Sequence, residues 1–147
     1  MGSKQESNRE LLERLQIREV AEAYFNALDR LDKAALAACF TEGAETIYHK
    51  GSPKERATRG RQTIVEELWK TRATHEKQNF TLSTMVVQLA GERAESTTFA
   101  IIQHLMQGKV SVAGMRYDDV FLKQDGRWLI DKRRHERLWE YVVDAVQ

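Results

Sequence analysis

The chain has 147 residues, of which 41% are hydrophobic and 31% are charged, which is typical of one soluble domain with a single core. We therefore interpret residues 1–147 as a single domain. Its 23 basic and 22 acidic side chains leave a formal charge of +1, so no overall field favours nucleic acid or an anionic membrane surface. The lone Cys39 cannot form an internal disulfide, and no apolar run approaches the roughly 20 residues of a membrane span. These properties favour a cytoplasmic protein that binds neither nucleic acid nor membrane.

Two helices are expected near the start of the chain. The segment Ser7-Asn8-Arg9-Glu10 has the form of a capping box, and apolar side chains recur after it at three- and four-residue steps. The apolar positions of this long first helix are Ile17, Val20, Tyr24, Leu28 and Leu31. Asp32 can cap a short second helix over residues 33–40, which Gly43 would end. The two helices are expected to form a hairpin.

A short strand, a loop and a third helix are expected next. Thr46–Tyr48 is typical of a strand, whereas residues 50–60 contain Gly51 and the only proline, Pro53, and indicate a mobile loop. The third helix is expected over residues 61–73. Its core positions are Ile64, Val65 and Leu68.

After Thr74 the pattern changes from helical to extended spacing. Four long strands are expected, approximately over residues 78–89, 94–107, 110–123 and 127–138. Turns between them are supplied by Gly91-Glu92, Gly108-Lys109 and Asp125-Gly126. Neighbouring strands should therefore pair antiparallel. Helices followed by strands indicate an α+β fold.

The predicted strands carry apolar side chains on both faces. In the first of them, Met85 and Val87 alternate with Leu82 and Val86. A strongly curved sheet wrapped around the helices accounts for this pattern. One face would then pack on the helices while the other lines a cavity or an interface between chains. The alternation does not assign the two faces.

The order of these elements resembles the SnoaL-like branch of the nuclear transport factor 2-like superfamily. Residues 17–36, with Tyr24-Phe25, are similar to the opening helix of the family's dehydratases and dehydrochlorinase. His75-Glu76-Lys77-Gln78-Asn79 is similar to the family's His-x-x-x-Asn entry into the first long strand, and residues 117–128 are similar to its closing hairpin. The resemblance covers about residues 10–140. It implies a cone-shaped α+β barrel, with helices packed against a mainly antiparallel sheet that encloses one pocket.

The resemblance also implies a set of site residues. Asp29 and His75 match the catalytic aspartate and histidine of scytalone dehydratase and the dehydrochlorinase. Arg133 falls where the dehydrochlorinase holds an arginine that stabilises the leaving group, and Tyr24 matches a tyrosine of bile-acid dehydratase. Thr98 stands where scytalone dehydratase carries a second catalytic histidine. The residues expected to contact substrate are Tyr24, Phe25, Tyr48, Thr98 and Arg133.

These residue types suit the elimination of water or a hydrogen halide beside an acidic C–H bond. Such a reaction needs a base, a group that holds the base in one tautomer, and a donor for the departing group. A histidine that donates one ring N–H to a carboxylate is more basic and fixed in orientation, so His75 and Asp29 supply the first two. Tyr24, Tyr48 and Arg133 can donate hydrogen bonds to the leaving group or to an enolate.

Each residue also has a structural explanation. Asp29 can cap the second helix together with Asp32, and His75 can be an exposed histidine at a helix-to-strand junction. Strand alternation places Asp131 and Arg133 on one face, so a local ion pair competes with a pocket role. Tyr24 and Tyr48 have core or rim packing as their alternative.

The remaining histidines and the cysteine indicate no metal or nucleophile site. His104 alternates with apolar neighbours and is interpreted as a core or pocket histidine, and Cys39 as packing. Neither His75-Glu76 nor His135-Glu136 is completed to a His-Glu-x-x-His zinc motif, and no glycine-rich phosphate loop occurs. We therefore expect neither a metal nor a cofactor.

Two functional hypotheses follow. The first is a cofactor-independent lyase, dehydratase or isomerase that uses Asp29 and His75 on a small, largely apolar cyclic or polyketide-like molecule. The second is a non-catalytic binding or assembly module resembling the β-subunit of aromatic-ring dioxygenases, in which an apolar sheet face contacts another chain. An Asp29 carboxylate bonded to His75 inside a closed pocket would favour the enzyme, and a separated pair would favour the module. In both cases we expect a homodimer or homotrimer.

Overall fold

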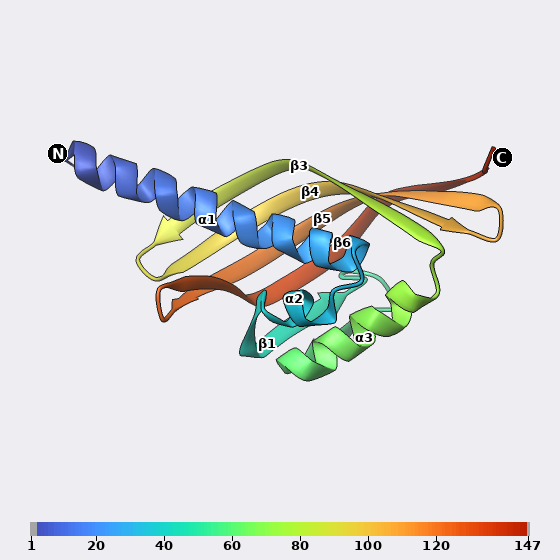
Figure 1. Ribbon diagram of the computed structural model, residues 1–147, viewed down its shortest axis with the longest axis horizontal. Coiled ribbons are helices and arrows are strands. Elements are labelled where there is room, and N and C mark those ends of the chain that lie inside the picture. The colour runs from blue at the N-terminus through green and yellow to red at the C-terminus, as the bar shows by residue number, and fades with distance from the viewer. Residues whose placement is uncertain (1–2, 147) are drawn as a thin grey trace.

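The computed structural model describes residues 3–146, which form three helices and one six-stranded sheet (Figure 1). The helices are α1 (Lys4–Asp29), α2 (Lys33–Ala37) and α3 (Arg61–Ala73). The strands are β1 (Phe40–Tyr48), β2 (Arg56–Arg59), β3 (Lys77–Ala90), β4 (Arg93–Met106), β5 (Lys109–Gln124) and β6 (Arg127–Asp144). Their order in the sheet is β2-β1-β6-β5-β4-β3, with β1 and β6 parallel and the other neighbours antiparallel. The predicted α+β fold with a curved, mainly antiparallel sheet is confirmed.

Helix α1 begins one turn earlier than the sequence indicated. Ser3 is its N-cap and accepts a hydrogen bond from the backbone N–H of Glu6 at 3.1 Å. The earlier Ser-x-x-Glu pattern therefore starts the helix, and Ser7 lies inside it. The second half of α1 buries the apolar stripe that contains Ile17 and Leu28, whereas the first half is exposed and extends past the sheet (Figure 1).

The segment between α1 and α3 is more extended than predicted. Asp32 caps α2 as expected, accepting from the backbone N–H of Ala35 at 3.0 Å, but α2 ends at Ala37. Strand β1 then runs from Phe40, so Gly43 lies within a strand. The predicted mobile loop over residues 50–60 contains β2, which pairs with β1. Backbone pairing along the sheet edge thus overrides the weak local pattern of this segment.

The four long strands form the predicted meander. Asp125 and Gly126 both adopt positive φ, 52° and 75°, in the two-residue turn between β5 and β6, which is the backbone conformation that this type of hairpin requires. The pairing register shifts between Leu82 and Met85 in β3 and twice between β5 and β6. Such bulges bend strands and increase their twist, and here they accompany the curvature of the sheet around the helices.

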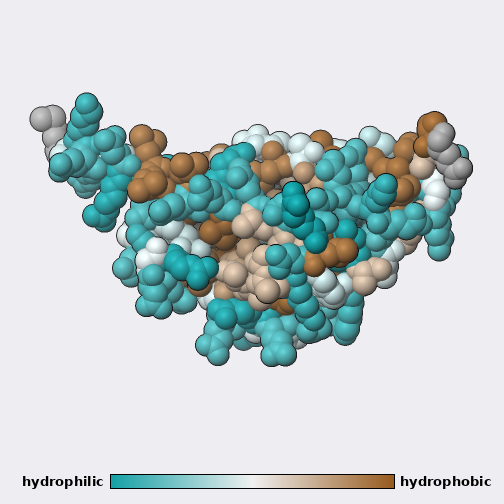
Figure 2. Space-filling model, in the orientation of Figure 1, coloured by the Kyte–Doolittle hydropathy of each residue, from teal (hydrophilic) through white to brown (hydrophobic). Residues whose placement is uncertain are grey.

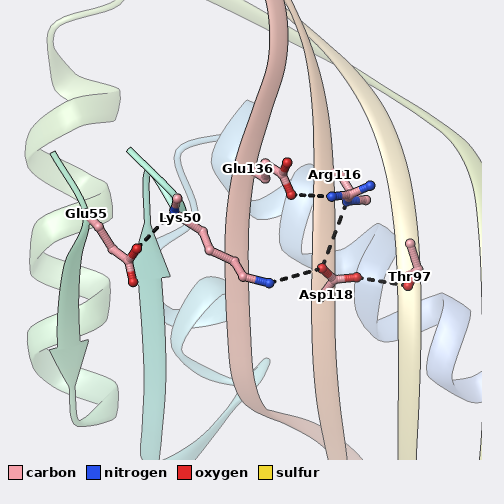
Figure 3. Close-up of polar contacts among 7 residues, drawn as sticks. Lys50, Glu55, Thr97, Arg116, Asp118 and Glu136 are labelled. Atoms are coloured by element: carbon pink, nitrogen blue, oxygen red, sulfur yellow. Dashed lines mark hydrogen bonds and ion pairs between the residues drawn. The ribbon is translucent and has the colours of Figure 1, made fainter. Parts of the chain in front are cut away.

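The helices pack on one face of the sheet, which we call the inner face. Alternate residues of β4 are buried there, among them Ala94, Ala100 and Ile102. No helix of residues 3–146 lies on the opposite, outer face. Figure 3 shows this face, with the helices behind the strands and a polar cluster centred on Asp118 in front. Asp118 accepts a hydrogen bond from Thr97 at 2.9 Å.

Two parts of the chain project from the body at opposite ends (Figure 1). One is the first half of α1, where Leu11 is 65% exposed, and the other is the end of β6, where Tyr141 is 54% exposed. Hydrophobic side chains are visible near both ends in Figure 2. Within residues 3–146, no helix has the length and apolar character needed to cross a membrane.

Candidate active site

A cavity of about 180 Å³ lies between the inner face of the sheet and the C-terminal ends of α1 and α3. Apolar side chains form much of its wall, including Leu28, Leu68, Phe80, Ile102 and Met115. Both Tyr24 and Tyr48, which the sequence placed in the pocket, line it, and so does His75. Three of the predicted site residues are therefore brought together.

All four histidines of the chain line this one cavity. His49 follows β1, His75 precedes β3, His104 lies in β4 and His135 lies in β6. Nδ1 of His75 and Nε2 of His135 are buried and have no hydrogen-bond partner within the described protein. The hydroxyl of Tyr48 is buried and unpartnered as well. Buried polar atoms are almost always paired, so unpaired atoms on three side chains that line one cavity indicate a place for a polar ligand.

The histidines are kept neutral by their surroundings. Burial and the nearby Arg72 lower the pKa of His75, and its ring stacks on that of His104 with centroids 3.9 Å apart. Burial, followed by the charge of His75, lowers the pKa of His104 to about 4. Burial and Arg133 lower the pKa of His135 well below its usual value. At neutral pH these imidazoles are therefore unprotonated, and each is a weaker base than an exposed histidine.

Arg133, which was expected to contact substrate, lies beneath the cavity and is not part of its lining. Its side chain is fully buried and makes two 2.8 Å bonds with the fully buried carboxylate of Asp119. The guanidinium carbon lies 4.3 Å from the ring centroid of Tyr24 and 4.8 Å from that of Tyr117, and both rings line the cavity. Nη1 of Arg133 has no hydrogen-bond partner among the described residues. Within residues 3–146, Arg133 forms its ion pair with Asp119 and not with Asp131, which accepts a hydrogen bond from Thr41 at 2.8 Å.

Asp29 lies away from this cavity. It is exposed at the last position of α1 and borders a separate hollow between α1 and β3. Within the described residues, no hydrogen bond joins His75 to Asp29, and Nδ1 of His75 has no partner there. The charged group that acts on His75 is Arg72, which donates from Nη1 to the His75 carbonyl oxygen at 3.1 Å.

Two further residues that were predicted to contact substrate, Phe25 and Thr98, are buried outside the cavity lining. Phe25 is buried, and its ring lies 5.6 Å from Tyr117 and 5.1 Å from Phe80, both of which line the cavity. Thr98 is fully buried in β4, and its hydroxyl has no partner. Neither residue is part of the cavity lining.

Arg72 is the main residue that the sequence analysis missed. It is only 6% exposed and lines the cavity from the last turn of α3. A signal was present, because Ile64, Leu68 and Arg72 follow one another at four-residue steps on the buried side of α3. Charged side chains are rarely buried unless they have partners, so an arginine on an apolar helical stripe is a candidate for a buried, hydrogen-bonded role.

A second hollow, of about 320 Å³, lies on the outer face of the sheet. Its lining carries both charges, with Asp118 and Glu95 beside Lys132 and Arg134. In the same region Lys50 and Arg116 each approach Asp118 at 4.0 Å, and Arg116 bonds Glu136 (Figure 3). Exposed pairs of this kind contribute little energy. Nowhere in residues 3–146 do three or more His, Cys, Asp or Glu side chains form a group that could hold a metal ion.

Comparison with known proteins identifies the family. The SnoaL-like domain matches residues 9–134. This chain belongs to the SnoaL-like family. No curated protein matches the sequence significantly.

Solved structures share the fold at low sequence identity. A candidate scytalone dehydratase from Novosphingobium aromaticivorans superposes with a TM-score of 0.82 at 20% identity, over 96% of this chain and 95% of that one. A type 2 hexachlorocyclohexane dehydrochlorinase (LinA) gives 0.81 at 9% identity, over 94% and 93%. A candidate dehydratase of the NTF2-like family from Streptomyces avermitilis gives 0.72 at 17% identity, over 84% and 94%. The cone-shaped NTF2-like fold is thereby established for this chain.

Proposed function

We propose that this protein is a cofactor-independent lyase, dehydratase or isomerase that moves protons within the histidine-lined cavity. The observation that carries the proposal is the convergence of the chain's four histidines on one cavity, with buried, unpartnered nitrogens on His75 and His135. A neutral histidine with a free ring nitrogen can accept a proton from carbon, most effectively when its pKa lies near the working pH. The similarity to dehydratase and dehydrochlorinase structures agrees with this class of chemistry, although fold alone does not assign it.

In this proposal His75 is the base. Its neutral imidazole would take a proton from a carbon atom next to a carbonyl group, with Nδ1 as the free acceptor. The Tyr48 hydroxyl would donate to the enolate oxygen or to the departing group, because burial raises its pKa and keeps it protonated. His135, whose ring contacts those of Tyr48 and Tyr117, would be the second proton carrier.

Asp29 keeps a proposed role as partner of His75. Arg72 bonds the carbonyl oxygens of both Leu28 and His75, at 2.7 and 3.1 Å, so the two segments are tied together. The exposed Asp29 carboxylate would orient His75 once it turns toward the cavity on ligand binding. The histidine cluster supports the proposal independently of this step.

Deuterium exchange tests the proposal without knowledge of the natural substrate. The protein in D₂O is mixed with 1-tetralone, and loss of the proton signal next to the ketone is followed by NMR. We expect catalysed exchange, with His75→Ala reducing its rate by about 10²–10⁴-fold, the usual contribution of a general base. Lys77→Ala, an exposed change two residues away, is the matched control. Equal rates for the two variants would contradict the role of His75.

The alternative, a non-catalytic assembly module, is favoured by two observations. Asp29 and His75 are separated in the structure, which is the arrangement expected for the module. The second observation lies on the outer face of the sheet. Trp139 and Tyr141 stack on the uncovered outer face, with ring centroids 6.0 Å apart, and each is about half exposed. A module of this kind would bind another chain through that face and show no exchange activity. The deuterium experiment therefore separates the two functions.

A further inference from the structure

Arg72 carries a buried positive charge that no carboxylate neutralises. Its side chain donates from Nε to the Leu28 carbonyl oxygen at 2.7 Å and from Nη1 to the His75 carbonyl oxygen at 3.1 Å. Within residues 3–146 it makes no ion pair and no other hydrogen bond, which leaves Nη2 without a protein acceptor. The guanidinium is therefore held in place while its Nη2 remains available.

The other arginines of the cavity lining differ in this respect. Arg56 bonds Glu67 at 3.1 Å, and Arg137 bonds Glu140 at 2.5 Å. Glu67 is the single acidic residue among the cavity-lining residues, and it is already engaged by Arg56 and Lys70. The whole chain is nearly neutral, yet this cavity gathers three arginines against one glutamate.

A role of Arg72 in stabilising the helix ends explains its bonds from Nε and Nη1 but not its unpaired Nη2. The C-terminal ends of α1 and α3 present partial negative charges of about half an electron each, and Arg72 lies at both ends. These dipoles stabilise the cation in place but leave Nη2 unpaired. A buried guanidinium whose Nη2 has no protein acceptor is suited to donate a charge-assisted hydrogen bond to a carboxylate.

We infer that the cavity binds a small anionic molecule, an apolar ring that bears a carboxylate, with the carboxylate held by Arg72. The inference rests on the proposed function and specifies its substrate class. The apolar wall around Leu68, Phe80 and Met115 contacts the ring. Because Arg72 also bonds the backbone of His75, an anion at Arg72 places the neighbouring C–H bonds close to the proposed base.

Equilibrium binding of a matched pair of probes tests the inference. Cinnamate and its uncharged amide, cinnamamide, have the same ring and chain and differ in charge. Titration calorimetry of the wild-type protein is expected to show cinnamate binding roughly tenfold or more tightly, as hydrogen bonds to a charged group provide. Arg72→Gln should remove the preference, and Arg72→Lys, which retains the charge, should keep part of it. Arg137→Gln, at a lining arginine already paired with Glu140, should retain it.

The outcomes that overturn the inference are distinct from a failure of the proposed function. Equal binding of both probes, tighter binding of cinnamamide, or no binding of either one contradicts it, as does a preference that survives in folded Arg72→Gln. Circular dichroism establishes whether each variant is folded. If Arg72→Gln is unfolded, the inference is tested by the preference of the wild-type protein for cinnamate and by the partial loss of that preference in Arg72→Lys. Catalysed exchange of 1-tetralone without a preference for cinnamate refutes only the anionic substrate. A preference for cinnamate without exchange refutes only the catalytic proposal.

Discussion

The buried pair of Arg133 and Asp119 is the residue-scale feature with the largest expected effect on stability. Both side chains are fully buried and bonded twice, so removal of one partner leaves the other charge uncompensated in the core. We expect Arg133→Met to lower the free energy of unfolding by about 3–5 kcal/mol. Urea unfolding followed by circular dichroism measures it.

The double variant Arg133→Met/Asp119→Asn distinguishes the pair from general packing. In Arg133→Met the buried Asp119 carboxylate has lost its partner, and Asp119→Asn removes that uncompensated charge. The double variant should therefore be more stable than Arg133→Met alone. Strictly additive losses would show that the two residues stabilise the fold independently.

His104 makes the stability of the protein depend on pH. Burial and then His75 lower its folded pKa from 6.5 to about 4. The unfolded chain therefore binds a proton between these values that the folded protein does not, and stability present above pH 6.5 is lost as the pH falls toward 4. The groups that face His104 are His75, Gln78, Arg72 and Arg137.

A comparison of melting temperatures at about pH 7.5 and about pH 5.5 measures this effect, in a range where most carboxylates remain ionised. His104→Gln retains an amide partner for Gln78 without a titrating group. We expect the variant to lose less stability on acidification than the wild-type protein. The same decrease in both proteins would assign the pH dependence to other residues.

At the scale of elements, the long helices and the four-strand meander were predictable because their patterns are strong and continuous. Helix α3 and the order of the strands agree with the sequence analysis. Strand β2 was not predictable, because residues 56–59 have no alternation and are ordered by pairing with β1, including a 2.7 Å ion pair between Arg59 and Glu45. Edge strands of this kind depend on a partner that local sequence does not reveal.

The bulge at Asp131 explains why the site was only partly predictable. Phe121 pairs with Ile130 but Val120 pairs with Lys132, so Asp131 is the extra residue of β6. Simple alternation therefore fails, and Ile130 and Arg133 share the inner face. A one-residue shift reverses every side chain beyond it, and it carries His135 into the cavity. Asp29 was assigned by resemblance alone, and its exposed position depends on where α1 ends.

At the scale of the whole molecule, the outer face of the sheet is the surface left without cover. Gly114 lies directly beneath Trp139, and a Cβ atom at position 114 would stand 2.2 Å from the indole ring. The absence of a side chain lets Trp139 lie flat on the sheet and stack with Tyr141. We call the stacked rings of Trp139 and Tyr141 the aromatic platform. On the same outer face, Asp118 carries a negative charge and Lys132 a positive one. A surface with both charges can complement a second copy of itself across a twofold axis.

We therefore expect the protein to self-associate through this platform, with a second copy of the chain as the occupant. Trp139→Lys removes a half-exposed aromatic residue of the type that dominates interfaces, so the dissociation constant should rise roughly 30-fold or more. Leu11→Lys, at a position 65% exposed on the projecting part of α1, is the matched control and should leave association unchanged. Light scattering after size-exclusion chromatography, over a range of concentrations, measures both. A wild-type protein that is monomeric at every concentration, or equal weakening by the two variants, would rule out the platform as the contact between copies.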